Sequence, residues 1–331
     1  MTIRAFFIFL FLLSLSALLS AQSESEKLRD ILMPYFVPVK IDTAFLISEK
    51  KKIYLGKSLF YDNRLSNNLG ISCNSCHDLE KYGTNGSLYT AGRMTVDFYR
   101  DVPTLYNIST LPIFNADGGI SSLKDKISQS LESSHEMGID KQQLLKSISL
   151  LDAYKKMFKE AYPNADIAIT HDNIVNALET FIKGLVTPAA IDRFMEGDMS
   201  ALSKEQIEGG HIFNSKSCYS CHTGSNIGGQ MIQKLGVAEE WPNQMDLGYY
   251  QIKKESVYKM FFRVSALRNI EKTAPYFHDA SSNKLWKAIQ RMGVHERGLD
   301  ISIDEALKIE EFLKALTGTI PYSYIDKTNL N

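Results

Sequence analysis

The chain has 331 residues and is nearly electroneutral, with 37 Lys and Arg residues against 38 Asp and Glu residues. This balance gives no sign of the basic surface that binds nucleic acid, so no nucleic-acid partner is expected. The length leaves room for two domains of roughly 150 residues each.

The N-terminal residues 1–21 have the pattern of a cleavable signal peptide. Arg4 precedes an apolar run from Ala5 to Leu13, and small residues follow as far as Ala21. A positive head, a short apolar core and a small-residue end are the parts of such a peptide. The run is also shorter than the ~20 residues that span a bilayer. We therefore expect export to the periplasm and no membrane span after cleavage.

Helical patterns dominate the remaining chain, and the expected fold class is mainly α. The first helix is expected over residues 27–35, followed by a Cys-x-x-Cys-His motif and a long polar loop over residues 78–100. Helices are expected next over residues 141–158 and along the apolar stripe of residues 174–185. Ser203 begins a helix that leads into a second Cys-x-x-Cys-His motif and the polar loop 223–247. A capping box at Ser302 begins the last helix, and Gly318 is placed to stop it.

The two Cys-x-x-Cys-His motifs, residues 73–77 and 218–222, contain all four cysteines of the chain. Two thiols one helical turn apart can reach the two vinyl groups of one porphyrin, and the next residue places an imidazole under the iron. A zinc ribbon is disfavoured because its Cys pairs usually lie about 15–20 residues apart. A thioredoxin-like dithiol needs a neighbouring βαβ pattern, and structural disulfides leave both histidines unexplained. We predict two haem c groups, attached through Cys73, Cys76, Cys218 and Cys221, with His77 and His222 as axial iron ligands.

The order of helix, motif, long loop and further helices occurs twice along the chain. We therefore expect two cytochrome c-like haem domains with long haem-wrapping loops. The N-terminal domain is expected over residues 22–190 and the C-terminal domain over residues 191–331.

Motifs outside the cysteines resemble those of the bacterial di-haem cytochrome c peroxidases, a superfamily that includes the MauG-type enzymes. The matching segments, in family order, are Leu55–Asp62, Val102–Asn107, Glu136–Gly138, Thr273–Asp279, Met292–Gly293 and Phe312–Gly318. The resemblance implies that the N-terminal haem reacts with hydrogen peroxide and that the C-terminal haem transfers electrons. It implies reduction of peroxide to water with electrons from a small periplasmic cytochrome c or copper protein (a cupredoxin), and it allows a homodimer.

The resemblance also assigns one catalytic residue and one iron ligand. Glu136 corresponds to the carboxylate that moves a proton between the two peroxide oxygens, which is general acid–base catalysis. Met292 corresponds to the sixth ligand of the second iron. The open alternatives for that ligand are a tyrosine, as in some relatives, or one of Met231, Met245, Met260 and His295.

A calcium ion between the two haems is the third implied feature. Its matched donors are Asp101 and the carbonyl groups of Thr273 and Pro275. Asp101 replaces the Asn that the family usually has, which keeps an oxygen ligand and adds a negative charge. Calcium prefers oxygen ligands of this kind.

Three positions depart from the family pattern. Ala116 stands where relatives often have a Trp between the haems, and Gly119 replaces the Arg of the same run; neither Trp241 nor Trp286 is a replacement in sequence. Lys126 stands where a Gln is common upstream of the catalytic Glu. We expect an altered pocket above the first haem and a different or slower path between the haems.

Two other functions fit the same motifs. A MauG-like oxidase would modify a side chain of a protein substrate. A non-catalytic di-haem electron carrier would have two six-coordinate irons and no use for Glu136. Between His77 and Glu136 the chain has no histidine except His135, so we expect no histidine from the intervening loop to block the first iron.

Overall fold

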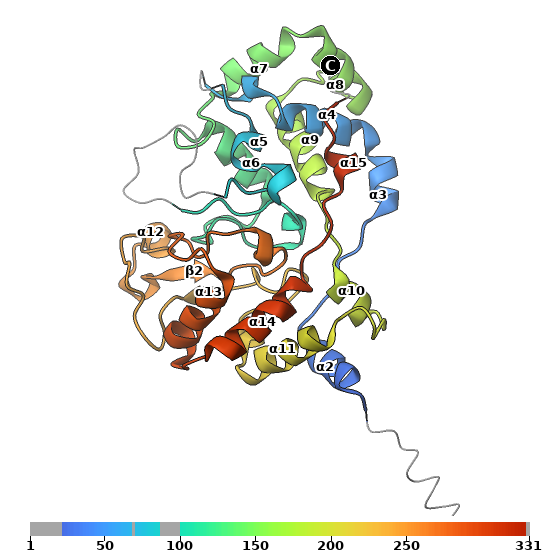
Figure 1. Ribbon diagram of the computed structural model, residues 1–331. Helices are drawn as coiled ribbons and strands as arrows, with labels where there is room; N and C mark the ends of the chain where they lie inside the picture. Colours follow the sequence, from blue (N-terminus) through green and yellow to red (C-terminus); the bar gives the residue numbers. More distant parts are fainter. Residues whose placement is uncertain (1–21, 68–69, 87–99, 329–331) are drawn as a thin grey trace, which may run out of the picture.

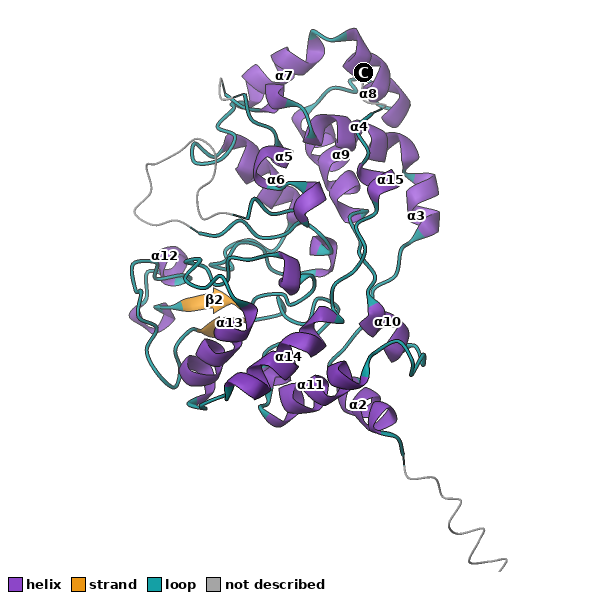
Figure 2. Ribbon diagram, in the orientation of Figure 1, coloured by secondary structure: helices purple, strands orange, loops and turns teal. Residues whose placement is uncertain are grey.

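The computed structural model describes residues 22–67, 70–86 and 100–328, and it is mainly helical (Figures 1 and 2). The predicted mainly α fold class is confirmed. The predicted signal peptide lies outside the described residues, as does most of the loop after the first motif. No helix in the described part of the chain is long and apolar enough to cross a membrane.

The helices form two groups, which are the upper and lower parts of Figure 1. The upper group contains α3 (Thr43–Ser48), α4 (Lys50–Phe60), α5 (Cys73–Cys76), α6 (Leu123–Glu132), α7 (Lys141–Ser149), α8 (Asp152–Ala161), α9 (His171–Lys183) and α15 (Tyr322–Ile325). The lower group contains α2 (Glu24–Leu32), α10 (Ala190–Met195), α11 (Lys204–Ser215), α12 (Tyr250–Lys253), α13 (Leu285–Met292) and α14 (Ile303–Lys314).

Short turns and one small sheet complete the described structure. Strand β1 (Ile232–Lys234) pairs antiparallel with β2 (Phe261–Arg263), and Ile232 lies opposite Arg263. The short helical turns are η1 (Asn63–Leu65), η2 (Leu79–Lys81), η3 (Ile108–Thr110), η4 (Cys218–Ser220), η5 (Ser256–Tyr258), η6 (Ile270–Lys272) and the π-helical η7 (Gly293–Arg297).

The two larger apolar clusters of the core lie one in each group of helices. The chain passes from the first cluster to the second between Leu185 and Ala189. Both ends of the chain cross over: Leu28 of α2 lies in the second cluster, and Ile325 of α15 lies in the first. The two expected haem domains, with their boundary at residue 190, stay a prediction.

Each group is built on one close pair of helices, α4 with α9 and α11 with α14. A Cβ added at Gly56 of α4 would collide with the carbonyl oxygen of Ala177, and one added at Gly209 of α11 would collide with that of Lys308. Glycine therefore permits the same backbone contact in both pairs. The structure thus repeats the helix packing as well as the motif order.

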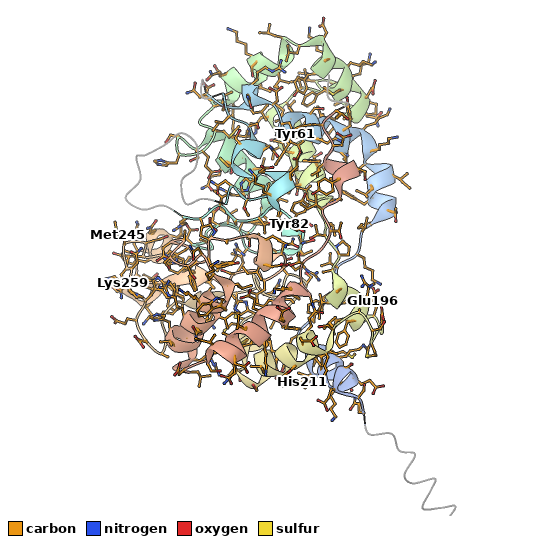
Figure 3. All side chains as sticks on the ribbon, viewed as in Figure 1. Tyr61, Tyr82, Glu196, His211, Met245 and Lys259 are labelled. Atoms are coloured by element: carbon orange, nitrogen blue, oxygen red, sulfur yellow. The ribbon has the colours of Figure 1, made fainter. Side chains whose placement is uncertain are left out.

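A buried hydrogen-bond cluster at Thr187 joins the two groups. Asn107 and Asn269 both have left-handed backbone conformations, with φ of 61° and 62°, and each precedes a 3-10 turn. Both side-chain amides donate to Oγ1 of Thr187, at 2.8 and 3.0 Å. Nearby, Tyr82 donates from its hydroxyl to the carbonyl of Gly318 at 3.1 Å, and Figure 3 shows Tyr82 between the two groups.

Capping residues fix several helix ends that the sequence predicts. The Ser302 hydroxyl accepts a hydrogen bond from the backbone N–H of Glu305, and the Glu305 carboxylate accepts one from Ser302, so the predicted capping box is confirmed. Ser203 starts α11 in the same way. The single helix predicted over residues 141–158 is wrong, because extended backbone at Leu151 separates α7 from α8. The loop 223–247 also contains β1, which the polar pattern did not indicate.

Replacing either helix-pairing glycine with alanine should destabilise the protein. We expect Gly209→Ala to lower the free energy of unfolding by about 1–3 kcal/mol or more, because the new Cβ must push α14 away. Lys204→Ala, at an exposed position of the same helix, should change it by less than about 0.5 kcal/mol. Thermal unfolding of the two variants measures the difference, and equal stabilities would contradict the close pairing of α11 and α14.

Candidate functional site

The first Cys-x-x-Cys-His motif forms one short helix and the residue that follows it. Helix α5 begins at a capping box between Ser72 and Ser75, and His77 directly follows its end. Nδ1 of His77 lies 3.2 Å from the carbonyl oxygen of Gly83 and 3.1 Å from that of Pro103. Burial lowers the pKa of His77, so the ring is neutral near pH 7. With Nδ1 donating to these carbonyls, Nε2 carries the lone pair that can bind a metal.

The second motif holds its histidine in the same way. His222 follows η4, and its Nδ1 lies 3.1 Å from the carbonyl oxygen of Ser265. Burial lowers the pKa of His222 to about 4. A Cβ added at Gly228 would collide with this same carbonyl oxygen. The backbone at Gly228 therefore packs directly against the group that accepts the hydrogen bond of His222. Pro103 and Ser265 lie four residues before Asn107 and Asn269, at matching places in the repeat.

The donor set of each motif fits a covalently attached haem. The four cysteines are not joined in disulfides. Burial raises the pKa of the Cys73 and Cys218 thiols to about 12 in each case, so they are neutral in the unmodified chain. Each motif therefore offers two thiols for the vinyl groups and one neutral imidazole for the iron.

Glu136 lies near the first motif, although many residues separate them in sequence. It belongs to the turn after α6, where its backbone N–H donates to the carbonyl of Ser133 at 2.9 Å. Burial raises the pKa of the Cys76 thiol, and the negative charge of Glu136 raises it further. The negative charge of Glu136 also acts to raise the pKa of Cys73 and of His77. The structure thus places Glu136 near the residues of the first motif, and its catalytic role stays a prediction.

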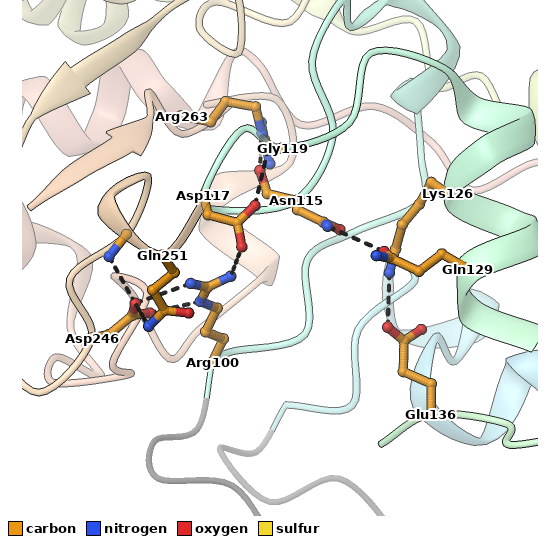
Figure 4. Close-up of polar contacts among 11 residues, drawn as sticks. Arg100, Asn115, Asp117, Gly119, Lys126, Gln129, Glu136, Asp246, Gln251 and Arg263 are labelled. Atoms are coloured by element: carbon orange, nitrogen blue, oxygen red, sulfur yellow. Dashed lines mark hydrogen bonds and ion pairs between the residues drawn. The ribbon is translucent and has the colours of Figure 1, made fainter. Parts of the chain in front are cut away.

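Lys126 forms an ion pair with Glu136. Its Nζ lies 2.8 Å from Oε1 of Glu136, and the two side chains are 24% and 42% exposed (Figure 4). Burial raises the pKa of Glu136, but the charge and hydrogen bond of Lys126, with help from Ser130 and His77, outweigh this effect, and the pKa lies below its ordinary value. The departure from Gln at position 126 therefore places a cation against the carboxylate.

The candidates for the second iron's sixth ligand occupy different environments. Met292 is the last residue of α13, and the π-helical turn η7 follows it. The pKa of Cys218 is raised by burial and partly lowered by Arg297 of that turn, so the turn lies near the second motif. Met245 is 69% exposed (Figure 3), whereas Met260 is buried in an apolar cluster. The assignment of Met292 stays a prediction.

The structure also describes the surroundings of His295 and the backbone of Met231, the other two candidates for that ligand. His295 is buried, and its Nδ1 lies 2.9 Å from the carbonyl oxygen of Glu239. Met231 accepts a hydrogen bond at its carbonyl from the backbone N–H of Val264, next to the small sheet.

The predicted calcium donors include one side chain in an unusual state. Burial raises the pKa of Asp101 to about 7, and the backbone N–H of Val102 reduces this shift. Thr273 ends the turn η6, and Pro275 follows two residues later. Within the described ranges, no three His, Cys, Asp or Glu side chains form a metal-binding group. The calcium site stays a prediction.

The segment that departs most from the family pattern lies in a network of charged residues. Arg100 pairs with Asp117 at 2.5 Å and with Asp246 at 2.6 Å, which ties the first group to the second (Figure 4). Ala116 packs against an apolar cluster that contains Trp241, which is 1% exposed. Trp241 and Ala116 thus share one apolar cluster, which their positions in the sequence did not indicate.

Comparison with known proteins shows the family of this chain. Residues 50–200 match the family model described as di-haem cytochrome c peroxidase. The cytochrome c551 peroxidase of Nitrosomonas europaea is 34% identical over 269 residues, which cover 81% of this chain and 80% of that protein. The chain belongs to the di-haem cytochrome c peroxidase family. The cytochrome c551 peroxidase of Pseudomonas aeruginosa is 30% identical over 312 residues, which cover 90% of this chain and 89% of that protein.

A solved structure shares the fold of this di-haem peroxidase family member. A MauG-like protein associated with microbial copper homeostasis superposes with a TM-score of 0.72, covering 90% of this chain and 97% of that one at 23% identity. At this identity the likeness supports the arrangement of helices alone.

Removing one cysteine pair should remove one haem. Intact-mass measurement should find two haems on the wild-type protein and one on Cys73→Ala/Cys76→Ala, because each attachment needs its own pair of thiols. The matched variant Cys218→Ala/Cys221→Ala should lose the other haem. A wild-type mass without added haem, after expression with a functional maturation system, would contradict the assignment.

Proposed function

We propose that this protein is a periplasmic cytochrome c peroxidase, which reduces hydrogen peroxide to water with two electrons and two protons. The electrons would come from a small cytochrome c or a cupredoxin. The observation that carries the proposal is the nearness of Glu136 to the first Cys-x-x-Cys-His motif. A non-catalytic electron carrier has no need of a carboxylate at that place.

Two haem groups would supply the iron and the redox chemistry. Cys73 and Cys76 would hold the first, with His77 as its axial ligand. Cys218 and Cys221 would hold the second, with His222 and Met292 as its axial ligands. Asp101 and the carbonyls of Thr273 and Pro275 would bind calcium between the two halves.

Residues near the first motif would carry out the proton transfer of the reaction. The Glu136 carboxylate, held by Lys126, would accept the proton from one peroxide oxygen and deliver it to the other, which then leaves as water. The Lys126 ammonium keeps this carboxylate ionised and therefore ready to accept. The carbonyls of Gly83 and Pro103 keep the His77 ring fixed while this transfer occurs.

Removing the Glu136 carboxylate should abolish most of the turnover. We expect Glu136→Gln to lower kcat/KM for peroxide by roughly 10²–10⁴-fold, because a positioned proton acceptor contributes that much to rates. The assay is peroxide-dependent oxidation of reduced cytochrome c, with haem content measured in parallel. Glu132→Gln, at the end of α6, is the matched control and should turn over like the wild type.

Two results would count against this assignment. Unchanged turnover in Glu136→Gln would show that another group moves the proton. Absence of turnover in a wild type that carries both haems would favour a MauG-like oxidase or an electron carrier.

Removing the Lys126 charge should change the pH dependence of turnover. Lys126 lowers the pKa of Glu136, so Lys126→Gln should raise that pKa, and the loss of activity on acidification should begin at a higher pH. Lys126→Arg keeps the charge and should retain a profile closer to the wild type. The measurement is kcat/KM for peroxide across pH, and superimposable profiles for all three proteins would contradict the role of the ion pair.

A further inference from the structure

Arg263 is a cation without an acidic partner among the described residues. It is the last residue of β2, and its Nε donates to the carbonyl oxygen of Asn115 at 3.2 Å. Its Nη1 is buried and has no hydrogen-bond partner. Burial alone lowers the pKa of Arg263, with no carboxylate nearby to raise it.

Other enclosed arginines of this chain have carboxylate partners. Arg268 donates from both terminal nitrogens to Asp192. Arg100 pairs with Asp117 and Asp246. A guanidinium removed from water is strongly destabilising unless an anion accepts its hydrogen bonds. The unpaired guanidinium of Arg263 therefore points to an anionic ligand.

The position of Arg263 indicates which anion that is. A Cβ at Gly229 would lie 3.3 Å from Nη1 of Arg263, and a Cβ at the preceding Gly228 would lie 3.1 Å from Nδ1 of His222. Ser265, which accepts the hydrogen bond of His222, follows Arg263 by two residues. The guanidinium thus lies against the same loop that packs on the second motif's imidazole.

The repeat gives Arg263 a counterpart in the first half of the chain. The backbone N–H of Arg263 donates to the carbonyl of Ala116 at 2.8 Å, and that of Asp101 donates to the carbonyl of His278 at 3.0 Å. Each residue precedes a valine and then the residue whose carbonyl holds a motif histidine. Both therefore lie at the junction of the two halves, with an acidic residue in the first half and a basic residue in the second at this matched place.

We propose that Arg263 binds a propionate carboxylate of the second haem, the one attached at Cys218 and Cys221. The inference rests on the proposed function to the extent that it requires this haem. A guanidinium presents a planar fork of N–H donors that matches a carboxylate, and every haem carries two propionates. A positive charge at this place stabilises the reduced haem and so raises its reduction potential.

The test compares reduction potentials of holoprotein variants. Arg263→Gln should carry both haems by intact mass, and spectroelectrochemical titration should show a lowered potential for the second haem. Arg263→Lys keeps the charge but not the fork, and should show a smaller shift. Arg193→Gln, whose side chain is 64% exposed in the same half of the chain, is the control and should show none. Resonance Raman spectra should show a changed propionate bending band in Arg263→Gln.

Three outcomes would overturn this proposal. The first two are an unchanged second-haem potential in an Arg263→Gln protein that carries both haems, and a shift in the potential of the first haem alone. The third is a wild-type potential that changes when chloride or phosphate is removed, because this result would assign the guanidinium to a free anion. If Arg263→Gln fails to fold, Arg263→Lys alone decides the question through the potential and the Raman band. A wild type without haem at Cys218 and Cys221 contradicts the proposed function itself, whereas a di-haem wild type inactive with peroxide contradicts only the peroxidase activity.

Discussion

The Oγ1 atom of Thr187 is the point on which the geometry of both candidate haem sites depends. It accepts hydrogen bonds from Asn107 and from Asn269 inside the protein. Each asparagine ends the segment whose carbonyl orients a motif histidine, Pro103 in the first half and Ser265 in the second. A shared buried acceptor therefore fixes the two imidazoles relative to each other, and buried amides left without it would be costly.

Features that depend on neighbouring residues could be predicted from the sequence. The motifs, the helix starting at Ser302 and the mainly helical class follow from spacing and capping, which act over a few residues. The break at Leu151 was missed because the apolar pattern continues on both sides of it. The unpaired state of Arg263 and the packing of Trp241 near Ala116 depend on segments far apart in the chain, and no local pattern reports such contacts.

Lys126 departs from the family pattern, and the structure shows which interaction this lysine makes. In the sequence it is a lysine where relatives have an amide. In the structure it is a counter-ion within 2.8 Å of Glu136, close to the first motif. The two side chains therefore form one ion pair near the first motif, and a change at one of them alters the pKa of the other.

The crossing of the two chain ends makes the halves of this protein interdependent. Helix α2 completes the core of the second half, while α15 completes that of the first. If the chain were cut near Thr187, α2 would stay on the N-terminal fragment although it packs in the second half. Helix α15 would stay on the C-terminal fragment although it packs in the first half. The two halves are therefore interlocked, because neither half takes its core from one continuous stretch of chain.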